Sequence, residues 1–298
     1  RPPVRNTDRA AKGDVMSDGV TSNRTWDERR ADAREVLGTM IGVDGATADK
    51  IADGMERRLG ALGTFASSAV MGDLWCRPQL SRRDRSLVVV SVLMAQARDE
   101  ELELHVANAL NHGMTRTEVD ELLLHVAAYA GFPAAMASVR RVDNAYNKID
   151  GNPEGTRRTR EAAEHLSDAE RDVRAADVRR TLTAGRAAAD PATDMANMQG
   201  LLGDVGALAF RFAFGEVWSR PQLSRRDRSL CVIAILAALG QAHELGVHVP
   251  GGLNHGLSRT EIEEVMVQMC LYAGFPRAVD GMLATKAAFA KIDARAAR

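Results

Sequence analysis

The chain has 298 residues, enough for about two average domains. Its 39 Lys and Arg residues balance 40 Asp and Glu residues, so the formal charge is −1 and no basic field favours nucleic acid or an anionic membrane as a partner. With only 7 Phe, 3 Tyr and 3 Trp among many helix-forming residues, the composition argues against a β-sandwich and predicts an all-α fold.

The three cysteines, Cys76, Cys231 and Cys270, lie far apart and form no C-x-x-C motif. They predict neither a disulfide framework nor a cysteine-based zinc site, and they favour a cytoplasmic protein. The sequence has no apolar run of about 18 residues and no apolar stretch near its start, so neither a membrane span nor a secretory signal is predicted. Residues 1–25 are predicted to be disordered, and Met16 is a plausible start that would make the preceding residues vector-derived or a truncated extension.

The helices of the first half can be predicted from their start and stop signals. Residues 26–70 indicate amphipathic helices, and 81–94 opens with an N-capping Ser-x-x-Asp before an apolar run. A helix over 101–113 ends at a glycine, and one over 115–131 opens with a Thr-x-x-Glu capping box. The last, over 133–150, begins with a proline.

The second half repeats the first. The thirteen residues from Trp75 to Leu87 return, with one substitution, from Trp218 to Leu230, 143 residues later. The same offset, without a gap, aligns roughly half of the residues in 75–150 with identical partners. Because solenoid repeats have periods of about 20–50 residues, this period predicts two tandem domains, 26–150 and 163–298, joined by a linker over 151–162.

Two glutamate–histidine pairs are the candidate catalytic residues. Glu101 and His105 in the first copy, and Glu244 and His248 in the second, are four residues apart and so share a helix face. A neighbouring carboxylate would raise the imidazole pKa and burial would raise that of the carboxylate, so either group could act as an acid near neutral pH. The alternative is an ordinary helical Glu–His pair, or a histidine whose hydrogen bonds are satisfied in the core.

Other polar residues repeat in both copies. A histidine before each C-capping glycine suits a helix C-terminus as well as it suits catalysis. An arginine in the first turn of a helix opposes the dipole, which indicates a partner carboxylate or an anionic substrate; an interface or solvated arginine is slightly favoured. The tryptophans are expected to be packing anchors that can also wall a pocket. The candidate binding residues are Trp75, Arg85, His112, Trp218, Arg228 and His255.

A metal site is not predicted. His243, Glu244 and His248 superficially suggest a zinc helix, but the histidines are five residues apart where H-E-x-x-H requires four. The first copy has Glu100 in place of His243, and the sequence contains no P-loop, dinucleotide fingerprint or nucleophile elbow.

The sequence resembles the carboxymuconolactone decarboxylase family. The resemblance lies in the run ELELHVANALNHG from Glu101, in TRTEVDE from Thr115, in YAGFP from Tyr129, and in their second-copy counterparts. It implies two tandem AhpD-like (alkylhydroperoxidase D-like) helical domains in one chain, which assemble as a homotrimer when duplicated. It also implies that Glu101, His105, Glu244 and His248 line the pocket for a small-molecule substrate.

The peroxidase branch of this superfamily requires a C-x-x-C before the histidine. Arg98 and Glu101 occupy those positions here, so a thiol peroxidase is excluded and the decarboxylase-like branch remains. The decarboxylation that names the family needs a hydrogen-bond donor to stabilise an oxyanion and an acid to protonate carbon, and it needs neither a metal nor an organic cofactor. The resulting hypothesis has His105 donating to the oxyanion, Glu101 handling the proton and Arg85 binding the substrate carboxylate. The alternatives are a related lactone- or ring-processing enzyme of secondary metabolism and a non-catalytic helical oligomerisation module.

The second copy departs from the first after its histidine. Pro250, Gly251 and Gly252 follow His248, which predicts a kinked or frayed helix. This favours the first site as the active one, although the divergence can equally mean that the second was retuned for another substrate.

Overall fold

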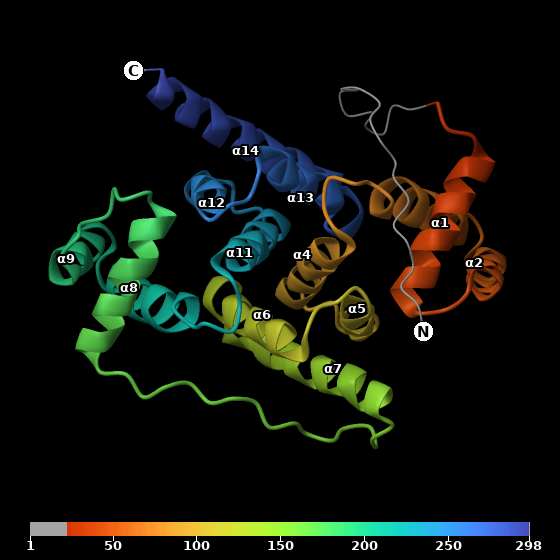
Figure 1. Cartoon of the computed structure of the whole chain (residues 1–298), viewed down its shortest axis with the longest axis horizontal. Helices are drawn as coiled ribbons and strands as arrows, with labels where there is room; N and C mark the ends of the chain where they lie inside the picture. The colour runs from red at the N-terminus through yellow and green to blue at the C-terminus, as the bar shows by residue number, and fades with distance from the viewer. Residues whose placement is uncertain (1–22, 298) are drawn as a thin grey trace, which may run out of the picture.

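The computed structural model describes residues 23–297, and every regular element within them is helical (Figure 1), which confirms the all-α prediction. In the first half these are α1 (Trp26–Ile41), α2 (Gly45–Leu59), α3 (Ala61–Phe65), the π-helix η1 (Ala66–Trp75), α4 (Arg82–Ala95), α5 (Asp99–Asn111), α6 (Arg116–Tyr129) and α7 (Phe132–Asp150). In the second half they are α8 (Asp168–Leu182), α9 (Pro191–Leu202), α10 (Asp204–Leu208), η2 (Ala209–Trp218), α11 (Arg225–Leu239), α12 (Ala242–Asn254), α13 (Arg259–Tyr272) and α14 (Phe275–Ala296).

The predicted helix signals act as expected. The Ser81 hydroxyl accepts a hydrogen bond from the Asp84 N–H and caps α4. Thr115 and Glu118 form the capping box of α6. Gly113, just past α5, has φ +94°, a backbone conformation that favours glycine. These local contacts explain why the predicted helix ends agree with the observed ones to within a few residues.

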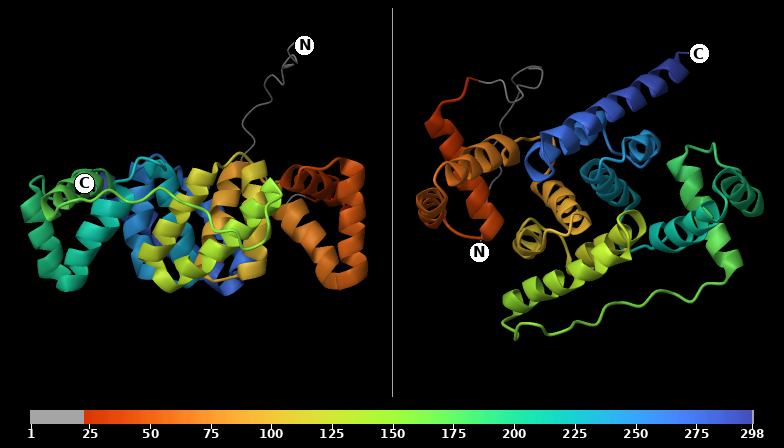
Figure 2. Two further views of the ribbon diagram at one scale, coloured as in Figure 1. Left: turned by 90° about the horizontal axis from the view of Figure 1, so that it is seen from below. Right: turned by 180° about the vertical axis from the view of Figure 1, so that it is seen from behind.

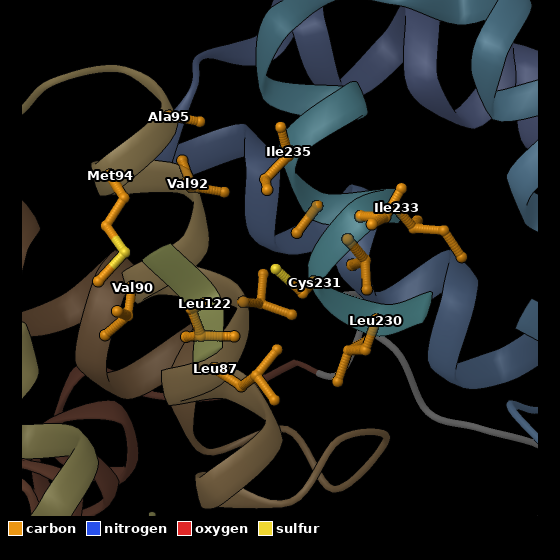
Figure 3. Packing of buried hydrophobic residues seen from close by; sticks show 14 of the residues in the cluster. Leu87, Val90, Val92, Met94, Ala95, Leu122, Leu230, Cys231, Ile233 and Ile235 are labelled. Carbon is orange, nitrogen blue, oxygen red and sulfur yellow. The ribbon is translucent and has the colours of Figure 1, made fainter. Parts of the chain in front are cut away.

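Two central helices join the halves. α4 and α11 lie side by side (Figure 1), and residues 84–95 and 227–238 are buried without interruption, as expected of helices surrounded on all sides. Figure 3 shows side chains of both helices, including Leu87, Val92, Cys231 and Ile235, in one hydrophobic cluster. The two halves therefore share a single core.

The halves also exchange partners around this core. α6 of the first half packs on α11 and η2, and α13 of the second half packs on α4 and η1. Reciprocal ion pairs cross the same boundary, from Arg83 to Asp227 at 2.9 Å and from Arg226 to Asp84 at 2.8 Å. The matching contacts follow the internal repeat, and they place residues of each half beside the other half's α4 or α11.

The upstream helices of each half project to opposite ends of a flat molecule. α1 and α2 lie at one end and α8 and α9 at the other, and in the edge-on view the helices stand side by side in a thin layer (Figure 2). No helix within residues 23–297 is long and apolar enough to cross a membrane.

Two predicted boundaries can be compared with the described residues. Disorder over 1–25 falls outside the described residues except for 23–25, where Arg24 donates to the Gly72 carbonyl at 2.8 Å and Thr25 caps α1. The stretch between α7 and α8 extends to Ser167, beyond the predicted linker end at 162. It is held against the first half, where Arg160 pairs with Asp120 and Asp143.

Of the predicted kink or fraying after His248, the fraying is wrong, because α12 continues through Pro250 to Asn254. Tertiary packing explains the outcome. A Cβ atom on Gly251 would lie 2.3 Å from Leu182 Cδ1, and one on Gly252 would lie 2.9 Å from Ile233 Cδ1. The two glycines therefore let α12 pack closely on α8 and α11, which holds the helix together despite the N–H that proline lacks.

Candidate active sites

The first ring cluster consists of Trp75, His105, His112 and Tyr272. Trp75 is the last residue of η1, and its indole N–H donates to the Tyr272 hydroxyl at 2.8 Å. The His105 ring is stacked with Trp75, with centroids 6.4 Å apart, and lies edge-to-face with Tyr272 at 5.5 Å. His112 lies 5.6 Å from the Trp75 ring. Since Tyr272 belongs to α13, this cluster is built from both halves.

The second ring cluster consists of Trp218, His248, His255, Tyr129 and His125. The Trp218 indole donates to the Tyr129 hydroxyl at 2.9 Å, and His248 lies 6.2 Å from Trp218 and 5.2 Å from Tyr129. The arrangement mirrors the first cluster, except for His125 of α6, whose counterpart at the 143-residue offset is Gln268 of α13. Both long π-helices end at the tryptophan of a cluster, and π-helical turns are frequent at functional sites.

The two buried arginines bind carboxylates of the opposite half. Arg85 is fully buried and pairs with Glu264 at 2.6 Å, and Arg228 pairs with Glu121 at 2.9 Å. Each of these glutamates also accepts from a second arginine, Arg77 or Arg220. The interface interpretation is therefore the one that the structure supports. The hypothesis that Arg85 binds the substrate carboxylate is not supported, because Glu264 already neutralises its guanidinium.

The four histidines of the repeated pattern have lowered pKa values. Burial, followed by the charge of a nearby His or Arg, lowers the pKa of His105, His112, His248 and His255 to about 4. The prediction that a neighbouring carboxylate raises the imidazole pKa is wrong, since desolvation dominates. At neutral pH these imidazoles are uncharged, so each can donate one hydrogen bond and accept another.

The glutamates of the predicted pairs lie apart from the histidines. Glu101 and Glu244 are exposed on the first turns of α5 and α12, and no hydrogen bond joins either of them to its histidine within residues 23–297. An acidic residue in the first turn is favourable with the helix dipole, which gives both a structural reason to be there. His105 is half-buried, whereas His248 is 5% exposed, so the first cluster is the more accessible of the two.

The histidines at the helix C-termini bind buried serines. The Ser86 hydroxyl lies 2.8 Å from His112 Nδ1, and the Ser229 hydroxyl lies 2.8 Å from His255 Nδ1. His255 also contacts the Thr181 hydroxyl through Nε2 at 3.0 Å. These histidines therefore occupy the C-cap positions of α5 and α12 and belong to the ring clusters at the same time.

Several residues of the two sites were not identified from the sequence. The pairing of Tyr129 and Tyr272 with the tryptophans, and of Glu121 and Glu264 with the arginines, crosses between halves and has no local signal. Their repetition at the 143-residue offset was the one available indication. In the described part of the chain, no three His, Cys, Asp or Glu side chains are grouped so that they could hold a metal ion.

The fold and the ring clusters define a duplicated helical protein with two candidate sites, each built from both halves around one tryptophan and its neighbouring histidines. The chain belongs to the carboxymuconolactone decarboxylase family, whose model matches residues 60–144 and 203–287, more than half of the chain. The two matched segments confirm the tandem repeat.

Two curated relatives carry decarboxylase names. The chain is 39% identical over 90 residues to 4-carboxymuconolactone decarboxylase of Acinetobacter baylyi, which is 30% of this chain and 67% of that protein. It is 34% identical over 79 residues to nitrosuccinic acid decarboxylase of Metarhizium robertsii, which is 26% of this chain and 55% of that protein. The second match thus spans little more than half of the relative's length.

Proposed function

We propose that the protein is a decarboxylase that needs no organic cofactor and acts on a small carboxylic acid whose carbanion is conjugated to an electron-accepting group. The names of the two relatives support this substrate class, since a lactone carbonyl conjugated to the reacting carbon and a nitro group can both take up an electron pair. The observation that carries the proposal is the neutral His105 imidazole beside Trp75 and Tyr272 in the accessible first cluster.

The reaction has two steps. The bond between carbon and the carboxylate breaks, CO2 leaves, and the electron pair moves onto an oxygen of the accepting group. A proton then adds to the carbon and the charge returns from oxygen. The protein must stabilise the oxyanion and supply the proton, and donors held in a desolvated site are effective at the first task.

The first cluster offers two such donors. The neutral His105 can donate an N–H, as the sequence hypothesis states. Tyr272 accepts the Trp75 N–H, which leaves its own O–H as a donor, and burial raises the pKa of this phenol so that it stays protonated. Glu101, which is exposed and one helical turn before His105, is the residue proposed to handle the proton, as the sequence hypothesis states.

The test measures CO2 release and ultraviolet absorbance with 4-carboxymuconolactone and with nitrosuccinate. His105→Gln is expected to reduce kcat by about 100-fold, the effect of removing one oxyanion donor, and a larger fall is expected when His248→Gln is added. Glu101→Gln is compared with Glu100→Gln, which changes an exposed glutamate on the same helix. Unchanged rates for both Glu101→Gln and Glu244→Gln would remove the glutamates from the mechanism.

Two alternatives predict other results. A lactone- or ring-processing enzyme of secondary metabolism would consume an unsaturated lactone without releasing CO2. A non-catalytic helical module would do neither, and the His105 variant would change only stability. The cytoplasmic location predicted from cysteine usage stays a prediction.

A homotrimer is part of the proposal, and a second copy of this chain is the proposed partner. Large apolar side chains are exposed at both ends of the molecule, where no other part of the described chain covers them. They are Leu59, Leu62 and Phe65 at one end and Leu201, Leu202, Val205 and Leu208 at the other. Light scattering is expected to give three times the 32.2 kDa chain mass, and a monomer would contradict the assembly.

A further inference from the structure

His125 of the second cluster corresponds, at the 143-residue offset, to Gln268 in the second repeat. The amide nitrogen and the amide oxygen of Gln268 both hydrogen-bond to Arg85. Its amide N–H donates to the Arg85 carbonyl at 3.0 Å, and its amide oxygen accepts from the Arg85 guanidinium at 3.4 Å. Gln268 therefore serves the interface between the halves.

His125 contacts Arg228, the counterpart of Arg85, through one ring nitrogen only. Arg228 lies 2.9 Å from His125 Nε2, and a guanidinium can only donate, so Nε2 must carry the lone pair. The proton of the neutral ring is then on Nδ1. The contact with Arg228 thus fixes the tautomer of His125, which is fully buried.

The protonated nitrogen lacks an acceptor. His125 Nδ1 is buried and hydrogen-bonds to no residue within 23–297. The ring lies edge-to-face with Trp218 at 5.2 Å and is stacked with Tyr129 at 6.3 Å, and both of these rings contact His248, whose Nδ1 is also buried without a partner there. Buried N–H groups without acceptors are costly and rare in folded proteins.

We propose that His125 is a specificity-determining residue of the second ring cluster, where its Nδ1–H donates to an oxygen of a bound small carboxylic acid. Gln268 holds its amide on Arg85 through its oxygen and one N–H, so the N–H that remains is fixed in another position than the ring N–H of His125. Because their donors differ in position, the two sites select different ligands, and the second site prefers acids with a further acceptor group in reach of His125 Nδ1. This inference rests on the proposed function in that both clusters bind small acids.

Histidine NMR tests the donor directly in the full chain. The seven histidines can be assigned by single substitutions in protein labelled with ¹⁵N-histidine. His125 is expected to show a protonated Nδ1 and an unprotonated Nε2, and its Nδ1 signal is expected to shift with 3-nitropropanoate more than with propanoate, which lacks the nitro acceptor. A protonated Nε2, or equal responses to the two acids, would overturn the proposal.

Reciprocal variants test specificity. His125→Gln is expected to reduce the preference of the second site for 3-nitropropanoate by about threefold to tenfold, the effect of one hydrogen bond, without altering the first site. Gln268→His is expected to give the first site that preference, and it keeps the test valid if His125→Gln does not fold. Unchanged preferences in the folded variants would overturn the proposal.

These outcomes separate the two proposals. Binding with the expected preference but no turnover of any acid tested would reject the decarboxylase proposal and leave the role of His125 standing. Turnover with no dependence of ligand preference on residues 125 and 268 would reject the role of His125 alone.

Discussion

The lowered pKa values of the ring-cluster histidines predict that the protein loses stability in mild acid, and His248 gives the sharpest test. Its side chain is 5% exposed, and burial lowers its pKa from 6.5 to about 4. Above pH 6.5 the imidazole is neutral in the folded and unfolded states and contributes no difference. As the pH falls from 6.5 towards 4, the unfolded chain binds a proton that the folded chain does not, so the free energy of unfolding decreases.

The magnitude follows from the size of the shift. One pKa unit corresponds to about 1.4 kcal/mol, so lowering the pH to 5 should remove roughly 2 kcal/mol through His248 alone. The assay is urea unfolding at pH 7.5 and pH 5 at one protein concentration. The His248→Gln variant should lose about 2 kcal/mol less than the original chain between these pH values, whatever the substitution costs at pH 7.5.

The matched control is His243→Gln, an exposed histidine on the same helix. Comparing each variant with itself at two pH values cancels the packing cost of the substitution. If His248→Gln and His243→Gln showed the same loss between pH 7.5 and pH 5, burial of the neutral imidazole would not be the source of the acid sensitivity.

Two further predictions concern stability and are measured by urea unfolding. Glu264→Gln should lower the free energy of unfolding by about 3–5 kcal/mol, since it leaves buried arginines without their carboxylate. The control is Glu263→Gln, which changes a half-buried glutamate paired with an exposed lysine and should cost under about 1 kcal/mol. Equal losses would contradict the role of the buried pair. Gly251→Ala should lower the free energy of unfolding by about 1–3 kcal/mol, because the new Cβ would overlap Leu182. In the control Gly246→Ala, on the same helix, the new Cβ meets nothing within 4 Å, so the change should be neutral or stabilising by up to about 1 kcal/mol. A neutral Gly251→Ala would show that α12 can move away from α8.

Local features of the fold could be predicted from the sequence because their causes are local. Ser81 and the capping box of Thr115 and Glu118 bind backbone groups within three residues, so the helix starts can be identified from spacing alone. The duplication could also be predicted, since it is a property of the sequence itself.

The composition of each site could not be predicted in the same way. A residue such as Tyr272 has the same sequence signal whether it meets the tryptophan of its own repeat or that of the other, and only the packing of α13 against η1 decides. The direction of the His105 pKa shift was also missed, because helical spacing predicts a neighbouring carboxylate but not the desolvation of the ring. Both the partner of Tyr272 and the pKa of His105 depend on packing between segments far apart in the sequence.

Contacts that cross between the two repeats have an evolutionary consequence. They are made by the tyrosines, by the glutamates that pair with the buried arginines, and by His125. When a gene duplicates, one copy is usually free to drift while the other keeps the original activity. Here His125 of the first repeat contacts Arg228 of the second, and Gln268 of the second repeat contacts Arg85 of the first, so a substitution at either position acts on the other repeat. A change at these crosswise positions in one repeat therefore acts on the site of the other, and fusion into one chain holds the two interdependent halves at a fixed one-to-one ratio.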